Sequence, residues 1–223
     1  MPEYNLLGHP KKLKRDVGIR LNDKEHNRAL AMKFDFEYFD GSREQGYGGY
    51  KYDGRWVAVA ERLKDRYKLR EGSCFLDVGC AKGFLMHDLT TICPGASIHG
   101  LDISLYAKNH ALALVKENID IGNCLKLPYE DNAFDAAVAI NTIHNLELDD
   151  CKKSIRELMR VTKNKKNIFI QVDAYSDKRE LEMFQAWVLT AQTYMMPDEW
   201  ENIFKEIGYE GDYFWTIIGF EGN

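Results

Sequence analysis

The sequence contains no apolar run as long as the ~18 residues that a membrane-spanning helix needs. Its first residues, Met1-Pro2-Glu3, lack the basic and then apolar pattern of a secretory signal peptide. The five cysteines are odd in number and lack the paired spacing of metal ligands; they are Cys74, Cys80, Cys93, Cys124 and Cys151. We therefore expect a cytoplasmic protein with reduced, mostly buried thiols, no membrane contact and no bound metal.

The chain also lacks an excess of positive charge, internal repeats and low-complexity segments. Its net charge of −5 argues against a broad contact with a nucleic-acid backbone, although a local basic patch is compatible with that average. With 223 residues, 45% of them hydrophobic, the chain can bury one sizeable core. The prediction is one domain with added segments, without nucleic acid as a partner; oligomeric state is left open.

Residues 75–85 predict a buried strand that turns sharply into a helix. The strand carries Asp77, and the turn is built from the small residues Gly79, Ala81 and Gly83. Such a turn points backbone N–H groups and the positive end of a helix at one place, and glycine lets a ligand approach the backbone closely. The pattern therefore predicts a nucleotide-type binding site.

A second predicted strand, Ser97–Asp102, ends in a carboxylate ~20 residues after the turn, where an acid that binds a ribose is expected. A ribose diol offers two donors, and one carboxylate can accept both. The alternative is that Asp102 only caps the turn before Ser104.

Apolar periodicity and turn residues predict the remaining elements. The expected helices are Val57–Tyr67, Ser104–Val115, Cys151–Val161, Asp177–Met196 and one that starts at Pro197 and ends at Gly208; the expected strands are Asn118–Gly122, Phe134–Ile140, Ile168–Val172 and Tyr213–Ile218. This alternation predicts an α/β fold with a doubly wound, mostly parallel sheet. The final strand leaves little room for a closing hairpin.

The first part of the chain differs from the rest. Residues 1–27 are polar, with a cationic cluster after Pro10 made of Lys11, Lys12, Lys14 and Arg15. They form either a solvated tail or the edge of a lid whose cations hold an anionic substrate. The segment Gly46–Trp56, rich in tyrosine and glycine, predicts a loop that closes over a flat or cationic ligand, or else aromatics docked on the core.

The order of these motifs resembles a class I S-adenosylmethionine-dependent methyltransferase over roughly residues 73–172. The motifs are Asp77-x-Gly79-x-Ala81-x-Gly83, Asp102 at the end of the second strand, Gly122-Asn123-Cys124 followed by Leu127-Pro128, and Asp135 at the start of the fourth strand. The whole chain also resembles a subgroup with Tyr-Phe-Asp-Gly and Gly-Tyr-Gly-Gly-Tyr segments, often associated with bacterial surface-polysaccharide genes.

The resemblance implies a Rossmann-like methyltransferase fold and S-adenosylmethionine as cofactor. It places Asp77, Gly79, Ala81 and Gly83 beside the methionine part, Asp102 at the ribose, Asn123 and Cys124 at the adenine edge, and Asn141 near the sulfonium, with Ile103 as a further cofactor-binding residue. Two residues depart from the common pattern, Ala81 for a glycine and Asn123 for an aspartate. An amide oxygen can still accept a hydrogen bond from the adenine amino group.

The acceptor side is predicted at the carboxyl end of the fourth strand, where open α/β sheets bind ligands. His144 is a candidate base or substrate contact, with a structural or cofactor-orienting role as the alternative. Tyr50, Arg55, Asp173 and Tyr175 are candidate substrate contacts, and Lys82 is expected to be solvated.

We therefore predict a domain at 57–223 with a helical insertion at 177–196, preceded by an extension and aromatic lid at 1–56. The predicted activity is methyl transfer to a small polar acceptor, such as a sugar or nucleotide-linked sugar, by direct displacement. His144 favours O-methylation; N-methylation and a non-catalytic cofactor-binding protein are alternatives. A nicotinamide oxidoreductase is disfavoured because Gly79-x-Ala81-x-Gly83 is not the dinucleotide spacing.

Overall fold

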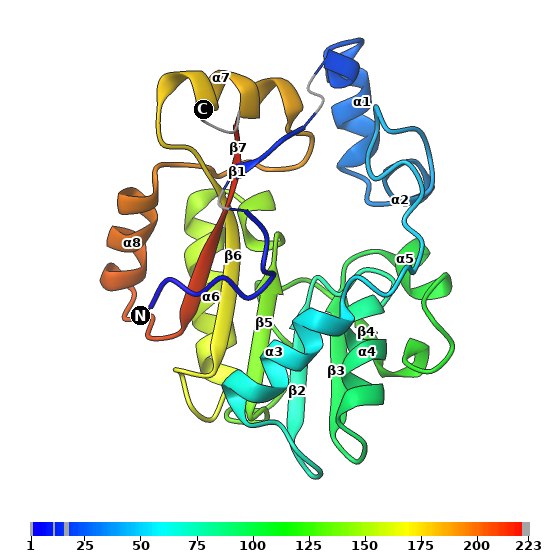
Figure 1. The fold of residues 1–223 in the computed structure, drawn as a ribbon, viewed down its shortest axis with the longest axis vertical. Coiled ribbons are helices and arrows are strands. Elements are labelled where there is room, and N and C mark those ends of the chain that lie inside the picture. Colours follow the sequence, from blue (N-terminus) through cyan, green and yellow to red (C-terminus); the bar gives the residue numbers. More distant parts are fainter. Residues whose placement is uncertain (1, 11, 16–17, 220–223) are drawn as a thin grey trace.

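A computed structural model describes residues 2–10, 12–15 and 18–219. Within them, seven strands form one sheet in the order β1-β7-β6-β5-β2-β3-β4, and neighbouring strands pair in parallel throughout. The strands are β1 (Lys12–Leu13), β2 (Cys74–Val78), β3 (Ser97–Asp102), β4 (Ile119–Ile121), β5 (Ala136–Ile140), β6 (Ile168–Ala174) and β7 (Asp212–Ile218). The predicted doubly wound α/β fold is confirmed (Figure 1).

Helices lie on both faces of the sheet (Figure 1). They are α1 (Lys24–Ala31), α2 (Phe36–Phe39), α3 (Val57–Tyr67), α4 (Phe84–Ile92), α5 (Leu105–Asn109), α6 (Leu148–Val161), α7 (Lys178–Trp187) and α8 (Pro197–Glu206), with short 3-10 turns η1 (Gly18–Arg20), η2 (Lys116–Asn118) and η3 (Ile143–Asn145). Apolar residues of α3 and α4 share one core with Phe75 and Val138, whereas those of α6 and α8 share another with Val78 and Ala139. Because both faces are covered, β5 is apolar along its whole length, and β2 and β6 are apolar at most of their positions.

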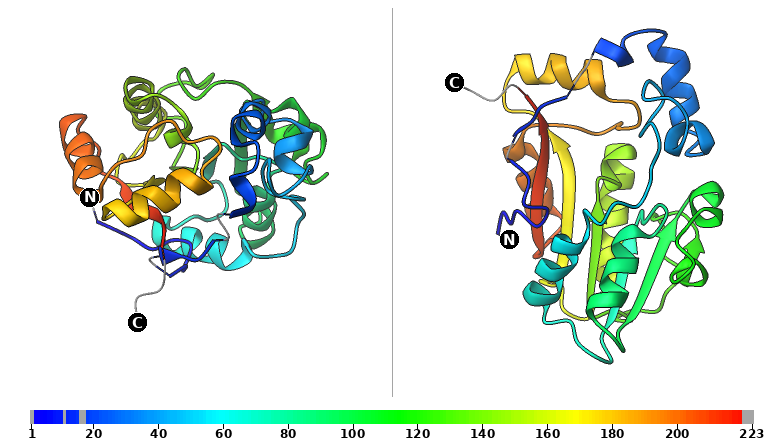
Figure 2. Two further views of the ribbon diagram at one scale, coloured as in Figure 1. Left: turned by 90° about the horizontal axis from the view of Figure 1, so that it is seen from above. Right: turned by 45° about the vertical axis from the view of Figure 1, so that its right-hand side comes forward.

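The strand order reverses its direction of growth between β2 and β5. In open parallel sheets, ligands bind at the carboxyl ends of the strands beside such a reversal. Gly79 follows β2 directly, Asp102 ends β3 and Asn141 follows β5, so the three predicted positions meet at this edge. Figures 1 and 2 show α1, α2 and α7 at the same end of the molecule.

Two predicted helices are shorter in the structure. The helix capped by Ser104 ends at Asn109, and the chain beyond it turns so that the Leu112 N–H donates to the Lys82 carbonyl. The helix expected over 177–196 ends at Trp187, because the N–H groups of Gln192 and Thr193 donate instead to the carbonyl of His144. These long-range bonds fix the following segment as an irregular strap against η3.

The N-terminal segment is not a solvated tail, so that alternative is wrong. Leu6 is 0% exposed, and the Tyr4 N–H donates to the Tyr213 carbonyl at 2.9 Å. Further along, Lys12–Leu13 pairs in parallel with β7 and forms the outer strand of the sheet. Within the described residues, the edge beyond β7 is thus covered by an N-terminal strand and not by a C-terminal hairpin. Lys12 also forms an ion pair with Glu180, whereas Lys11 lies outside the described residues.

Cationic side chains join the N-terminal helices to the end of α7. Lys24 donates to the carbonyls of Gln185 and Ala186, and Arg28 donates to that of Ala191. The last carbonyls of a helix have no partner within it and carry a partial negative charge. A lysine beside them therefore both satisfies the carbonyls and complements the helix dipole.

Lys82 joins the turn after β2 to the N-terminal segment, so the expectation that it is solvated is wrong. It is buried, and its Nζ donates to Asp40 Oδ2 at 2.6 Å and to the Tyr50 carbonyl at 3.0 Å. The Tyr106 hydroxyl donates to the same Asp40 oxygen at 2.7 Å. Burial alone raises the pKa of Asp40, but the hydrogen bonds from Lys82, Tyr106 and the Tyr50 N–H outweigh it and hold the pKa below its ordinary value.

We predict that Asp40→Asn lowers the free energy of unfolding by about 1–3 kcal/mol at pH 7, because it leaves the buried Lys82 ammonium without its counter-charge. The folded-state pKa of Asp40 lies below the unfolded value of ~3.9, so the difference from the wild type is present above that pH and disappears as the pH falls through the folded-state pKa. Urea denaturation at several pH values measures it. Asp65→Asn, at an exposed aspartate of α3, is the control; equal stability of both variants would contradict the prediction.

Candidate active site

Gly79, the first residue after β2, requires a glycine on two grounds. Its φ of +79° lies in the left-handed region, and a Cβ there would lie 2.0 Å from Thr142 Oγ1. Ala81 also has a positive φ, +50°, which is costly for a residue with a Cβ. The turn is thus held against its backbone preference by bonds from outside it.

The side chain of Asp102 makes the hydrogen bonds that stabilise this turn. Its Oδ2 accepts from the Ala81 N–H at 2.7 Å and its Oδ1 from the Ser104 N–H at 2.8 Å. Burial still raises the pKa of Asp102, although these N–H groups oppose the rise. Each carboxylate oxygen has two lone pairs, so both can accept a further hydrogen bond. Asp102 therefore caps the turn before Ser104, as one of the two sequence-based interpretations predicts, and it also lines a cavity.

This first cavity, of about 130 Å³, lies at the carboxyl ends of β2, β3 and β5. Seven predicted cofactor residues line it: Gly79, Ala81, Asp102, Ile103, Asn123, Cys124 and Asn141. Ile103 is 55% exposed, so it presents an apolar surface to any ligand there. Asn123 Oδ1 accepts from the Leu125 N–H at 2.9 Å, and burial raises the pKa of the Cys124 thiol, which keeps it neutral. The walls are therefore suited to a flat, mostly neutral group.

A second cavity adjoins the first at Gly79, Ala81 and Asn141. Asp77, Tyr50 and Arg55 line it, as does Trp56, whose buried indole N–H has no hydrogen-bond partner among the residues that the structure describes. Burial and the nearby Asp102 raise the pKa of Asp77 to about 7. A cationic group of a ligand would stabilise the ionised form of Asp77 and so lower its pKa again. Arg55, in the same cavity, can pair with an anionic group of the ligand. Gly83 lines none of the cavities described here and instead begins α4 at a φ of +71°.

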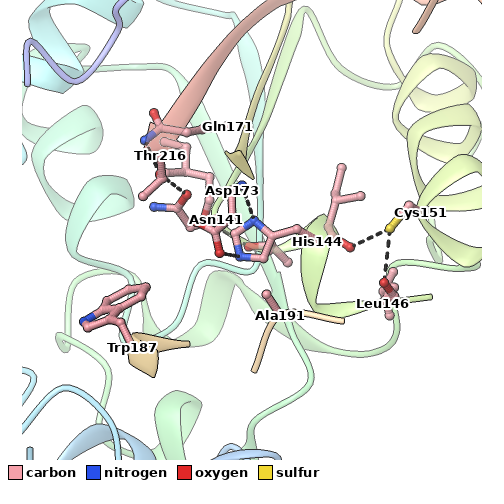
Figure 3. Close-up of polar contacts among 12 residues, drawn as sticks. Asn141, His144, Leu146, Cys151, Gln171, Asp173, Trp187, Ala191 and Thr216 are labelled. Carbon is pink, nitrogen blue, oxygen red and sulfur yellow. Dashed lines mark hydrogen bonds and ion pairs between the residues drawn. The ribbon is translucent and has the colours of Figure 1, made fainter. Parts of the chain in front are cut away.

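A third cavity lies on the other side of Asn141 and contains His144, Asp173 and several arginines. Asn141 and Tyr47 line all three cavities, so the three meet at these two side chains. Asn141 Oδ1 accepts from the Thr216 hydroxyl at 2.8 Å, which in turn accepts from Gln171 Nε2 at 3.0 Å (Figure 3). This chain of bonds fixes the Asn141 amide at the junction.

His144 and Asp173 form a buried pair beside that junction (Figure 3). The Asp173 N–H donates to His144 Nδ1 at 3.0 Å, and His144 Nε2 lies 3.2 Å from Asp173 Oδ2. Because Nδ1 accepts, this bonding pattern assigns the proton of the neutral ring to Nε2, which faces Asp173 Oδ2. Burial lowers the pKa of His144 to about 3 and raises that of Asp173 to about 8.

Sequence reasoning missed several residues of the site and placed one elsewhere. Tyr47 lies in the predicted loop but is not among the predicted site residues. Gln171 and Thr216 lie in predicted strands, and no site role was predicted for them. A polar residue within an apolar strand was the available signal for the last two. Tyr175 lines none of the three cavities.

Comparisons with known proteins agree with this geometry. Residues 76–170 match the family described as "Methyltransferase domain". The match covers less than half of the chain, and it shows that this segment is similar to methyltransferase domains. This similarity supports S-adenosylmethionine as the cofactor of the site. No helix in the described part of the chain has the length and apolarity needed to cross a membrane.

Similarity to individual proteins is lower. The tRNA (carboxymethyluridine(34)-5-O)-methyltransferase of Arabidopsis thaliana is 28% identical over 151 residues, a match that covers 66% of this chain and 34% of that protein. The ajmaline N-methyltransferase of Rauvolfia serpentina is 29% identical over 178 residues, covering 69% of this chain and 60% of that protein. The chain therefore spans less than two thirds of either relative. The solved structure of the [4+2]-cyclase SpnF shares the fold, with a TM-score of 0.56 and 21% identity over 68% of this chain and 56% of that one.

The residues present fit this cofactor. The first cavity combines the Asp102 carboxylate with the Asn145 amide oxygen, a buried atom without a partner in the described part of the chain, which can accept from an amino or hydroxyl group. The second cavity combines Asp77, which suits an ammonium, with Arg55 and the Trp56 N–H, which suit a carboxylate. The two adjoining cavities therefore match an adenosyl group and an amino-acid group.

We predict that Asp102→Asn weakens binding of S-adenosylhomocysteine by about 1–3 kcal/mol, because the amide offers one acceptor oxygen where the carboxylate offers two. Titration calorimetry measures the affinity, and thermal unfolding separates this loss from a loss of fold. Asp65→Asn is again the control. Unchanged affinity in the folded Asp102 variant would contradict the ribose role.

Proposed function

We propose that this protein transfers the methyl group of S-adenosylmethionine to an oxygen of a small polar acceptor bound in the third cavity. The observation that carries the proposal is the meeting of all three cavities at Tyr47 and Asn141. A bound sulfonium supplies an electrophilic methyl group, so placing an acceptor in line with it provides much of the rate acceleration. The third cavity is the space from which an acceptor can approach that junction.

We assign the proton-accepting role to Asp173 and a positioning role to His144. The lone pair of His144 Nδ1 accepts a backbone N–H, and Nε2 carries the proton. The neutral ring therefore has no free lone pair with which to take a proton from a substrate hydroxyl. Asp173 lines the cavity, and its raised pKa lies close to neutrality, as a general base requires. The Nε2–H of His144 orients the carboxylate and stabilises its ionised form.

A pair of aromatic rings and the polar bonds that hold their segment support a cover over this site. Tyr47 and Tyr50, whose ring centroids lie 4.4 Å apart, belong to the segment that Lys82 and the α7 carbonyls hold in place. We propose that residues 1–56 act as a lid on the domain at 57–223, and that the strap and helix at 177–196 shape the acceptor cavity. Tyr50 and Arg55 line the second cavity, which supports a role for both close to the methionine group; Arg55 also lines the third cavity, which supports a contact with the acceptor as well.

The alternatives differ in the acceptor atom and in the reaction. The Arabidopsis relative is named for transfer to an oxygen and the Rauvolfia relative for transfer to a nitrogen, so N-methylation is the second candidate. The fold is shared with a cyclase, so a cofactor-binding protein without methyl transfer is a further alternative. The net charge of −5 favours a small acceptor over tRNA, and the resemblance to a surface-polysaccharide subgroup favours a sugar.

Calorimetry with S-adenosylhomocysteine and with NADH tests the cofactor first, and the proposal expects binding of the former alone. Transfer of a labelled methyl group to panels of sugars, sugar phosphates, carboxylates and amines then tests the activity. Binding of S-adenosylhomocysteine without transfer to any panel member would favour the non-catalytic alternative.

We predict that kcat rises with pH through a value near 8, because Asp173 accepts a proton only when it is ionised. Asp173→Asn should lower kcat by at least about 100-fold while the affinity for S-adenosylhomocysteine stays within about twofold. His144→Phe should move the kcat profile to higher pH, because the carboxylate loses its donor. A flat profile in the wild type, or full turnover in the Asp173 variant, would exclude this base.

A further inference from the structure

We propose that the acceptor carries an oxyanion, a phosphate or a carboxylate, that the arginines of the third cavity bind. This proposal rests on the proposed function, since it concerns the acceptor of the same reaction. It adds a charge requirement that the domain match does not supply. The arginines come from four places in the N-terminal segment: position 15 after β1, η1, the loop at 42–49 and the loop at 53–56.

The charges that line this cavity are unbalanced. Arg15, Arg20, Arg43 and Arg55 line it, and among the described residues Asp173 is the one acid that does. Asp173 has a raised pKa, so it offsets little positive charge near neutral pH. A cavity with several guanidinium groups and a mostly protonated carboxyl group attracts anions and repels cations.

Arg20 is the most buried of these arginines, at 5% exposed. Its guanidinium donates to the carbonyls of Trp187 at 3.0 Å, Gly46 at 2.6 Å and Arg43 at 3.3 Å, and it lies 4.7 Å from the Trp187 ring centroid. These bonds use three of its five N–H donors and provide no counter-charge. Burial and the nearby Arg43 charge accordingly lower the pKa of Arg20 to about 10. A buried cation without a counter-charge is costly, and a bound oxyanion would supply one.

Arg43 and Arg55 complete the group from more exposed positions. Arg43 donates to the carbonyls of Gly46 and Tyr47, so its guanidinium is fixed beside Tyr47 at the junction of the cavities. Arg55 pairs with Asp53 on its outer side and also lines the second cavity. Arg55 can therefore serve the cofactor carboxylate as well, whereas Arg20 and Arg43 line the acceptor cavity and not the second one.

The geometry also suits the charge of the cofactor. A sulfonium at the junction would add a further positive charge beside these arginines, and an anionic acceptor offsets both. Guanidinium groups bind phosphate and carboxylate through paired N–H donors, which fixes the orientation of the bound group as well as its charge. The arginines would thus turn the reacting oxygen of the acceptor toward Asp173 and Asn141.

The test titrates two probes, inorganic phosphate and acetate, into protein with ¹⁵N-labelled arginine, with and without saturating S-adenosylhomocysteine. The Nε–Hε resonances of Arg20 and Arg43 are followed by NMR. We expect saturable shifts at both arginines with at least one probe, and the probe that binds more tightly identifies phosphate or carboxylate as the acceptor group. The absence of saturable shifts with both probes up to 50 mM, a concentration of roughly the magnitude at which millimolar sites saturate, would overturn the proposal.

Variants separate this site from general charge effects. Arg43→Gln should weaken the anion affinity by about tenfold, because a charge-assisted hydrogen bond is lost, and Arg43→Lys should retain part of it. Arg156→Gln, at an exposed arginine of α6, is the matched control and should bind the anion as the wild type does. Equal weakening by Arg43→Gln and Arg156→Gln would overturn the proposal.

The same titrations distinguish a failure of this proposal from a failure of the proposed function. S-adenosylhomocysteine binding without anion binding overturns the anionic acceptor and leaves methyl transfer standing. Anion binding without S-adenosylhomocysteine binding supports the arginine site and contradicts the proposed reaction. Unchanged S-adenosylhomocysteine affinity in the Arg43 variants shows that their fold and cofactor cavities are intact.

Discussion

The carboxylate of Asp102 is the contact on which the site depends. One oxygen accepts the N–H of Ala81 and the other that of Ser104, so a single side chain ties the turn after β2 to the turn after β3. Ala81 holds a left-handed conformation that its Cβ disfavours, and the bond to Asp102 offsets part of that cost. A residue that would otherwise serve only a ligand thus also shapes the cavity that receives it.

Around this contact, the N-terminal segment encloses an edge that the sheet alone leaves open. Polar bonds contribute to its attachment: Lys82 reaches Asp40 and the Tyr50 carbonyl, while Lys24, Arg20 and Arg28 reach carbonyls at and beyond the end of α7. Apolar contacts add to these bonds, because Leu6 is fully buried and the Tyr50 ring stacks on Phe84 with ring centroids 4.7 Å apart. Charge-assisted bonds and apolar packing thus together hold the segment over the edge of the sheet.

The parts of the site that follow from local sequence could be predicted. Gly79 and Asp102 are specified by a short strand and a short turn each, and the structure places both at the expected edge. The alternating helices and strands likewise specified the parallel sheet. Local patterns could not specify the pairing of Lys12–Leu13 with β7, since that register joins residues about 200 positions apart.

The same reason explains the remaining misses. Lys82 looks like a surface lysine until Asp40 is folded against it, and the helix after Asp177 ends early only because η3 supplies acceptors for Gln192 and Thr193. The arginine group is the clearest case, because its members are separated along the sequence and lie in loops. Their proximity is a product of tertiary structure, and a basic cluster around Lys11–Arg15 was the one partial signal.

A crystal structure with bound S-adenosylhomocysteine tests the central claim most directly. We expect the ribose hydroxyls within hydrogen-bond distance of both Asp102 oxygens, the amino-acid end in the cavity of Asp77 and Arg55, and the sulfur beside Tyr47 and Asn141. A ligand bound with its ribose away from Asp102, or with its sulfur closed off from the cavity of Asp173, would contradict the arrangement proposed for this enzyme.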